Sequence, residues 1–173
     1  ACHLVCITYD RIEGMKKKKV NKEFLFLFTI PILIRSLSQL LRIIVKAEKF
    51  TKRKKISNKS VFEKRLYRDM YHFGQQVQYA YFLALDIAFN LSNQTHPVFK
   101  YDEKTTTDLK RNLNRVIVYL KSLKPSHFRG AEKKRVPVFY NKKHKLRAIY
   151  YLQTLGLPDF FSITPPLTVF SDT

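Results

Sequence analysis

The sequence predicts a mainly α-helical protein with long helices and an extended basic segment towards the C-terminus. Apolar residues recur every three or four positions in several stretches of the 173-residue chain, as they do along one face of a helix. The chain carries 33 Lys and Arg against 13 Asp and Glu, which gives a formal charge of +20. An apolar fraction of 45% is too high for a disordered basic tail, so we expect a folded core.

Residues 1–55 are expected to form a small N-terminal helical domain of the helix-turn-helix type. Residues 1–20 end in a lysine run, and two helices are predicted over residues 21–48 with a break near Pro31. Ser36 is a suitable N-cap for the second helix. The predicted buried face of that helix consists of Leu37, Leu40, Leu41, Ile44 and Val45.

The most apolar run is residues 24–34, which number 11 and include Pro31. A membrane-spanning helix needs about 20 apolar residues, and charged residues flank this run on both sides. A buried core helix is therefore favoured, and no membrane span is predicted. A membrane anchor over residues 24–45 is kept as the alternative.

Residues 56–107 are expected to form an additional helical region, preceded by a basic linker over residues 49–59. Ser60 and Glu63 have the spacing of a capping box, which predicts a helix that continues to about Asn90. Gly74 marks either a break or a close contact within it. The apolar stripe of this helix consists of Phe62, Leu66, Met70, Phe73, Val77, Phe82, Leu85 and Phe89.

Residues 108–150 are expected to form a helix followed by a basic extension. A loop over residues 93–104 precedes Thr107, the predicted N-cap of a helix over residues 108–123, and Pro125 ends that helix. Its predicted buried face consists of Leu109, Leu113, Val116, Ile117, Leu120 and Leu123. Residues 151–173 lack Lys and Arg and are rich in apolar residues. We expect them to form a tail that docks on another protein.

The sequence offers little that predicts catalysis. The five His are scattered, and no Gly-rich phosphate loop or nucleophile motif is present. Cys2, His3 and Cys6 provide at most three ligands at an unusual spacing for zinc. The sequence therefore predicts a protein that is not an enzyme, with no catalytic residue, no metal site and no cofactor.

The basic segment is the predicted binding site. Arg can form paired hydrogen bonds to phosphate oxygens and Lys acts as a point charge, and the interleaved Phe and Tyr could stack on exposed bases. The alternatives are a charge run that is merely solvated and a contact with anionic lipid. The predicted RNA-binding residues are Lys18, Lys19, Arg129, Gly130, Lys133, Lys134, Arg135, Lys142, Lys143, Lys145 and Arg147.

A series of short motifs resembles the family of the universal small-subunit ribosomal protein thirteen. In chain order, the matching pieces are Arg-Ile-Glu-Gly at 11–14, Lys-Lys-Val at 18–20, Ser-Leu-Ser-Gln-Leu-Leu at 36–41, Leu-Lys-Arg at 109–111, Arg-Gly at 129–130, the basic run with Val-Pro-Val at 133–138, Asn-Lys-Lys at 141–143 and Arg-Ala at 147–148. The Gly-Ile-Gly turn of that family is absent, and Ile-Leu-Ile stands near its place at 32–34. Together with the longer 56–107 region, this resembles a divergent mitochondrial member.

The resemblance implies a structural constituent of the head of the mitochondrial small ribosomal subunit. Such a protein binds ribosomal RNA near the intersubunit bridge and the peptidyl-site tRNA. Its implied neighbours are small-subunit protein nineteen, large-subunit protein five and other organellar ribosomal proteins, and its implied location is the ribosome of the mitochondrial matrix. The alternative is a basic, matrix-facing subunit of an organellar membrane complex anchored by residues 24–45. A third possibility is an independent RNA-processing factor.

Overall fold

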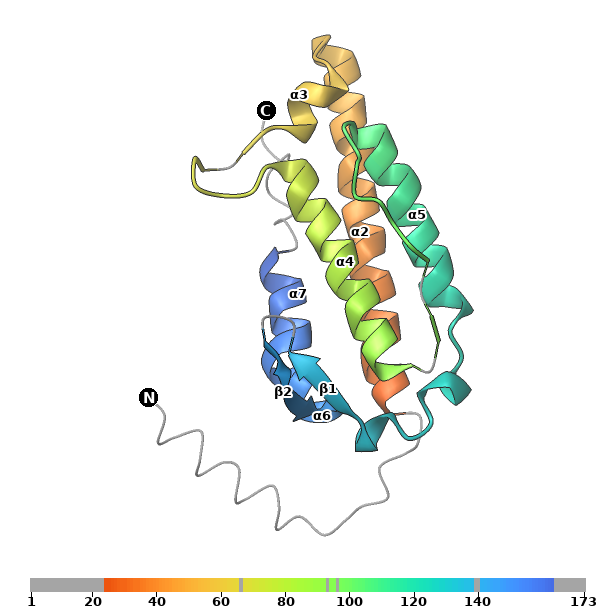
Figure 1. Ribbon diagram of the computed structural model, residues 1–173. Coiled ribbons are helices and arrows are strands. Elements are labelled where there is room, and N and C mark those ends of the chain that lie inside the picture. Colours follow the sequence, from red (N-terminus) through yellow and green to blue (C-terminus); the bar gives the residue numbers. More distant parts are fainter. Residues whose placement is uncertain (1–23, 66, 93, 96, 139–140, 164–173) are drawn as a thin grey trace.

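Four helical segments pack side by side in the computed structural model, which describes residues 24–65, 67–92, 94–95, 97–138 and 141–163. They are α2 (Phe24–Lys54), α4 (Phe73–Leu91), α5 (Thr106–Ser122) and a C-terminal run of α6 (Ala148–Tyr151), the π-helical turn η3 (Leu152–Gly156) and α7 (Leu157–Ile163). Helices α2 and α7 run in one direction and α4 and α5 in the other (Figure 1). The prediction of a mainly helical protein is confirmed.

Helix α2 is one continuous helix of 31 residues that includes Pro31, so the predicted helix-turn-helix domain with a break at this residue is wrong. Proline removes a backbone donor to the carbonyl four residues earlier, at Leu27. Pro31 and Leu27 are both exposed, so water can satisfy that carbonyl and the helix continues.

By length and composition alone, α2 could also cross a membrane, as the core helices of many soluble proteins could. Its buried face packs against α5 and α4.

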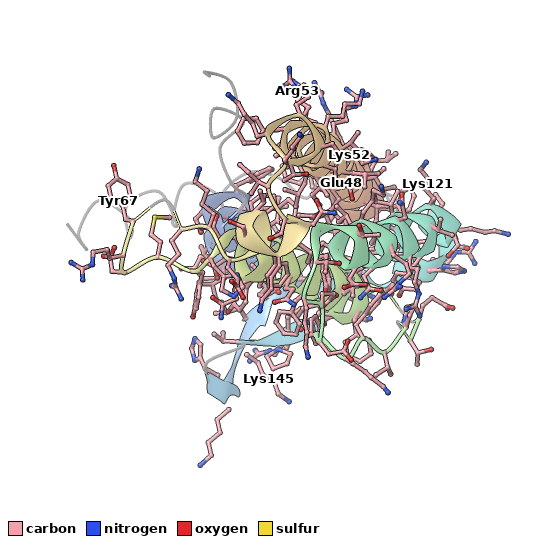
Figure 2. The ribbon with its side chains drawn as sticks, turned by 90° about the horizontal axis from the view of Figure 1, so that it is seen from above. Glu48, Lys52, Arg53, Tyr67, Lys121 and Lys145 are labelled. Carbon is pink, nitrogen blue, oxygen red and sulfur yellow. The ribbon has the colours of Figure 1, made fainter. Side chains whose placement is uncertain are left out.

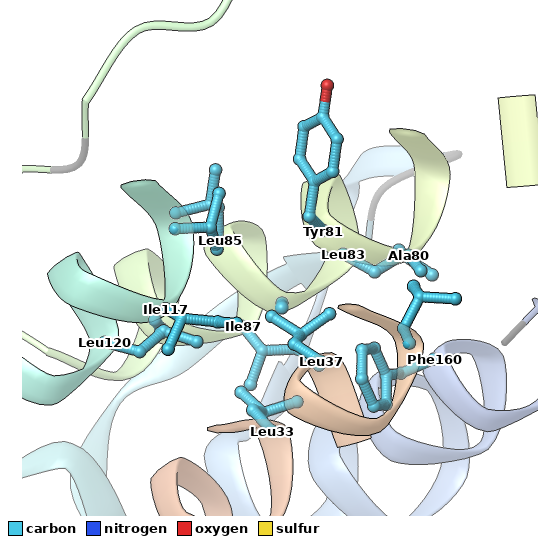
Figure 3. Packing of buried hydrophobic residues seen from close by; sticks show 14 of the residues in the cluster. Leu33, Leu37, Ala80, Tyr81, Leu83, Leu85, Ile87, Ile117, Leu120 and Phe160 are labelled. Atoms are coloured by element: carbon cyan, nitrogen blue, oxygen red, sulfur yellow. The ribbon is translucent and has the colours of Figure 1, made fainter. Parts of the chain in front are cut away.

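The core fills the space between the four helical segments (Figure 3). Leu33 and Leu37 of α2, Ile87 of α4, Leu120 of α5 and Phe160 of α7 are all fully or almost fully buried there. The predicted buried face of the 108–123 helix is confirmed, because all six of its residues are buried. Close packing of this kind is the main contribution to the stability of a bundle.

The predicted helix from Ser60 to Asn90 is interrupted. The short helix α3 (Asn58–Phe62) starts at the N-cap Ser57. Ten residues separate it from α4, which starts at a capping box formed by His72 and Gln75. A Cβ atom at Gly74 would lie 2.3 Å from the Phe62 ring. Gly74 therefore marks a close contact between α3 and α4, one of the two roles predicted for it.

Helices α4 and α5 are parallel, so the chain must return along the length of the bundle between them. Residues 97–104 make this return without helix or strand, along a path beside the two helices (Figure 1). Helix α5 then starts at the N-cap Thr105, whose hydroxyl accepts a hydrogen bond from the Asp108 backbone N–H. The predicted cap, Thr107, is two residues too late.

The predicted extended basic segment is a folded hairpin at one end of the bundle. It follows two short turns, η1 (Pro125–Phe128) and η2 (Ala131–Lys133), and consists of the antiparallel strands β1 (Arg135–Val138) and β2 (Asn141–Arg147). Gly130 has φ of 77° between the two turns, a conformation that favours glycine. Val136 is buried and Leu146 packs against the core, so one face of the hairpin covers the bundle.

Residues 148–163 form the fourth helical segment rather than a tail that docks on another protein. Tyr151, Leu152, Leu157 and Phe160 are buried in the same core as α4. Gly156 lies where a Cβ atom would be 3.1 Å from the Tyr151 ring and 3.4 Å from Ile87, so it allows the π-helical turn to approach α4 closely. Residues 164–173 lie outside the described residues.

We predict that Gly74→Ala lowers the free energy of unfolding by about 1–2 kcal/mol, because the added methyl group overlaps the Phe62 ring. Urea denaturation of the full chain measures this change. In a Phe62→Leu background the ring is gone, so the same substitution should be neutral or stabilising, because Ala is a better helix former than Gly. An equal loss of stability in both backgrounds would disprove the contact.

Candidate functional site

The predicted RNA-binding residues are distributed over several elements with different roles. Lys18 and Lys19 lie outside the described residues, as does the side chain of Lys142. Arg135 and Arg147 are opposite one another in the β1–β2 ladder, and both are exposed together with Lys145 on the face of the hairpin that points away from the core. In the view from above, Figure 2 shows Lys145 on the hairpin, to one side of the helices. The remaining members, Arg129, Gly130, Lys133 and Lys143, are exposed.

Lys134 is the member of this set with a clear structural role. Its Nζ donates hydrogen bonds to the carbonyl oxygens of Leu91 (3.2 Å) and Ser92 (2.8 Å), where α4 ends. The last carbonyls of a helix lack partners within the helix and carry partial negative charge. Burial lowers the pKa of Lys134. The ammonium group therefore caps the C-terminus of α4 and is not available to bind a polyanion.

Two hollows on the described surface are candidate sites. One, of about 560 Å³, lies beside α3 and is lined by Phe50, Ile56, Ser57, Lys59, Ser60, Val61, Glu63 and Lys64. Apart from Phe50 and Val61, these residues are exposed, and Lys59 and Glu63 pair with each other at 3.7 Å. This surface is well solvated and contains no distinctive chemical group.

The second hollow is an aromatic pocket of about 330 Å³ on the outer side of α4. Its lining, which defines the aromatic pocket, consists of Tyr71, Gln75, Gln78, Tyr79, Phe82 and Tyr101. Gln75, Tyr79 and Phe82 are spaced along one face of α4, Tyr71 comes from the loop before the helix, and Tyr101 comes from the 97–104 segment. Two amides therefore lie among four aromatic rings.

The rings of the aromatic pocket form a continuous row. The centroids of Tyr71 and Tyr79 are 6.4 Å apart, those of Tyr79 and Phe82 are 5.8 Å apart, and those of Phe82 and Tyr101 are 5.9 Å apart. Behind this row, Tyr101 stacks on the buried Tyr81 at 5.6 Å. Ring pairs at these distances stabilise one another, so the wall of the pocket is already assembled without a ligand.

Tyr101 adopts a backbone conformation that is unusual for its residue type. Its φ is 53°, in the left-handed region that L residues with a large side chain seldom occupy. Such a conformation costs on the order of 1–3 kcal/mol and persists where the surrounding structure enforces it, often at functional sites. Here the stack on Tyr81, the edge contact with Phe82 and the Gln78 amide, 3.4 Å from the Tyr101 carbonyl oxygen, hold the residue in place.

A buried carboxylate lies directly behind the pocket. Glu103 is 6% exposed and accepts hydrogen bonds from the Tyr81 hydroxyl and the Asn112 amide at Oε1, and from Gln78 Nε2 at Oε2 over 2.8 Å. Burial alone would raise the pKa of Glu103, but these hydrogen bonds together hold it below its ordinary value. Glu103 is therefore an anion at neutral pH, bonded to three uncharged side chains.

The hydroxyl groups of Tyr79, Tyr81 and Tyr101 remain protonated. Burial raises the pKa of Tyr81, and so does its hydrogen bond to Glu103. Burial also raises the pKa of Tyr79, with further contributions from Tyr71, Asp159 and Asp86. For Tyr101, burial raises the pKa and the charge on Glu103 adds to the effect. The pocket thus presents neutral phenols and amides in front of negative charge.

The sequence contains a signal for this site that the prediction did not use. Phe82 belongs to the predicted apolar stripe of a long helix, whereas Gln75, Gln78 and Tyr79 have no predicted role. These residues recur at helical spacing on the side of α4 opposite its most buried positions. Tyr101 and Glu103 lie in the predicted loop, where no periodic pattern draws attention to them.

In the described part of the chain, no group of three or more His, Cys, Asp or Glu is placed to hold a metal ion.

We predict that Lys134→Met lowers the free energy of unfolding by about 1–2 kcal/mol, because two carbonyl groups at the end of α4 lose their charged donor. Lys133→Met, one residue earlier and exposed, should change it by less than about 0.5 kcal/mol. Thermal or urea denaturation compares the two variants. Similar effects would refute the capping role of Lys134.

We predict that Glu103→Gln lowers the free energy of unfolding by about 2 kcal/mol at pH 7. Because the pKa of folded Glu103 lies below its ordinary value of 4.5, its contribution is fully present above pH 4.5 and is lost as the pH falls through the folded pKa. The difference between the wild type and the variant should therefore shrink below pH 4.5. Urea denaturation as a function of pH measures it. Asp102→Asn, at an exposed neighbour, is the control and should show no such trend; a constant difference for Glu103→Gln would contradict the assignment.

Comparisons with known proteins identify both a family and a fold. The sequence matches the DUF1993 family, described as a domain of unknown function, over residues 25–162. A DinB family member protein from Shewanella denitrificans has a crystal structure that superposes with a TM-score of 0.75 at 23% sequence identity, over 83% of this chain and 84% of that chain. At this identity the likeness establishes a shared fold. No curated protein sequence matches the chain.

These findings overturn the resemblance to small-subunit ribosomal protein thirteen. The predicted ribosomal function and the predicted partners, namely ribosomal RNA, peptidyl-site tRNA and ribosomal proteins nineteen and five, are therefore wrong. The short motifs that suggested the resemblance lie in elements that are unrelated to one another. Residues 36–41 are in the middle of α2, and Arg129-Gly130 is a turn. Short basic motifs recur readily in a chain with 33 Lys and Arg.

The alternative, a membrane-complex subunit anchored by residues 24–45, is also unsupported, because these residues supply one wall of the bundle core. The mitochondrial location and the absence of catalysis stay predictions. The family match extends from near the start of α2 to the end of α7 and so includes all four helical segments. The chain therefore belongs to the DUF1993 family.

Proposed function

We propose that the protein is a non-catalytic binding module and that the aromatic pocket is its site for a small organic ligand. The observation that carries this proposal is Tyr101, which is held in a left-handed backbone conformation and supplies one wall of the pocket. Strain of this kind reduces stability. If the segment that contains Tyr101 only had to connect α4 with α5, Gly or Asn at position 101 would make the protein more stable.

The exposure of the rings supports the same proposal. Tyr71 is 58% exposed and Tyr101 is 38% exposed, so both rings offer apolar surface at the mouth of the pocket. Ligand pockets combine apolar and aromatic walls with a few polar groups that fix orientation. The amides of Gln75 and Gln78 are polar groups of this kind, and both belong to the lining.

The chemistry of the lining favours binding over catalysis. Its six residues are phenols, amides and a phenyl ring, and the lining includes no His, Cys, Asp, Glu or Lys. General acid–base catalysis uses a group whose pKa lies near the working pH. Glu103, the carboxylate behind the pocket, is engaged by three hydrogen-bond donors and is 6% exposed, so its role is to hold the site in place.

We predict that Tyr71→Ala weakens ligand binding about fivefold, because it removes one aromatic wall. The measurement is saturation-transfer-difference NMR on the full chain with four probes: choline, dimethylbutanol (in which carbon replaces the nitrogen of choline), phenol and indole. We expect at least one probe to bind the wild type. Titration of that probe then gives the affinities.

Tyr67→Ala is the matched control. Tyr67 lies in the same loop as Tyr71 and is 67% exposed, but it is not part of the pocket. Figure 2 shows it at the outer edge of the loop, away from the bundle. This variant should bind the probe as the wild type does. Binding that Tyr67→Ala and Tyr71→Ala weaken equally, or no binding of any probe by the wild type, would refute the proposed site.

A further inference from the structure

We propose that the aromatic pocket selects a small organic cation with a methylated ammonium group over neutral or anionic ligands. This inference rests on the proposed function, since it assigns a ligand class to the same site. It follows from three features of the described residues: the row of aromatic faces, the ionised carboxylate behind it, and the separation of this site from the basic surfaces of the protein.

The rings of the aromatic row are close enough together for a cation to lie against their faces. Tyr71, Tyr79, Phe82 and Tyr101 follow one another with centroids 5.8 to 6.4 Å apart. The face of an aromatic ring carries partial negative charge and attracts a cation within about 6 Å of its centroid. The same cluster already holds one cation in this way, because the Arg115 guanidinium lies 4.9 Å from the centroid of Phe99, which in turn is 6.5 Å from that of Tyr101.

Negative charge lies behind and beside this row. Gln78, which lines the pocket, donates to Glu103, and the three donors to Glu103 are uncharged, so its formal charge is not neutralised by an ion pair. Asp86 follows Phe82 by four residues on α4, and Asp159 is in the first turn of α7, which packs on α4. Their charges add to the upward shift that burial gives the pKa of Tyr79.

Many cations of this strongly basic protein lie on α2 and the hairpin, although Arg115 at Phe99 and Arg65, which donates to the Met70 carbonyl beside Tyr71, are near the pocket. Arg35, Arg42, Lys46 and Lys49 are exposed along α2, and Arg135, Lys145 and Arg147 are exposed on the hairpin. Lys100 and Lys104 lie in the same segment as Tyr101, but both are exposed to water, whose high dielectric constant weakens their interaction with the pocket. An anion would thus be attracted to α2 or the hairpin, whereas the pocket favours a cation.

A methylated ammonium group suits the pocket better than a primary amine. Its methyl groups bury apolar area against Tyr79 and Phe82, and its charge is weakly hydrated and spread over those methyl groups, so less hydration is lost on binding. A pocket of about 330 Å³ is at the small end of the range for ligand sites and accommodates such a head group. The amides of Gln75 and Gln78 provide hydrogen bonds for a hydroxyl or carbonyl next to the ammonium group.

The test is a comparison of choline with dimethylbutanol, its neutral isostere, by isothermal titration calorimetry on the full chain. We expect choline to bind about fivefold more tightly, because the two probes share shape and hydroxyl group and differ only in charge. Tyr79→Leu keeps an apolar side chain but removes one π-face. The ratio of the affinity for choline to that for dimethylbutanol should therefore fall towards one. Tyr67→Leu, outside the pocket, should keep the wild-type preference.

The outcomes separate this inference from the proposed function. Equal or tighter binding of dimethylbutanol, weakened by Tyr71→Ala, would overturn the cation preference and leave the site in place. Binding of phenol or indole with no binding of choline would have the same meaning. If no probe binds, both proposals fail. If circular dichroism shows that Tyr79→Leu does not fold, the comparison of the two probes on the wild type alone decides the inference.

Discussion

The structure depends on the buried carboxylate of Glu103. Because α4 and α5 are parallel, the chain must travel back along the bundle before α5 begins, and this return has no helical or sheet hydrogen bonds of its own. Glu103 links it to Tyr81 and Gln78 of α4 and to Asn112 of α5. Three donors compensate for the loss of hydration that burial of a charge entails. One side chain therefore sets both the spacing of two helices and the path between them.

The same anchor accounts for the aromatic pocket. Phe99 and Glu103 are both buried, so the intervening residues have little freedom, and Tyr101 lies midway between them. Its ring stacks on Tyr81, whose hydroxyl donates to Glu103, and its backbone adopts a φ of 53° as a result. The strain at Tyr101 is thus maintained by contacts on both sides. The pocket and the carboxylate form one unit, in which the phenols are held neutral and the carboxylate is held ionised.

The sequence predicts the regular parts of this fold and misses the parts that depend on tertiary contacts. The buried face of α5 follows from its spacing, because an amphipathic helix encodes its own orientation. The continuity of α2 through Pro31 could not be predicted, since it depends on the exposure of Leu27 in the assembled bundle. The capping role of Lys134 requires the end of α4 to lie beside a residue that follows Ser92 by 42 positions in the chain. Tyr101 and Glu103 were missed because a loop has no periodicity, and their importance arises only from the two helices that they contact.

The distribution of charge explains why composition pointed to the wrong partner. A net charge of +20 is typical of proteins that bind polyanions, but the fold divides its charges between separate surfaces. Several carboxylates pair with cations, as Glu48 does with Lys110 at 2.7 Å and Asp108 with Arg111 at 3.1 Å. Glu103 is instead bonded to neutral groups, so its charge acts on the rings in front of it. Net charge describes the long-range field of the molecule, whereas a binding site responds to the few groups within one Debye length. At the aromatic pocket those groups include Glu103, and the local preference is opposite in sign to that of the whole chain.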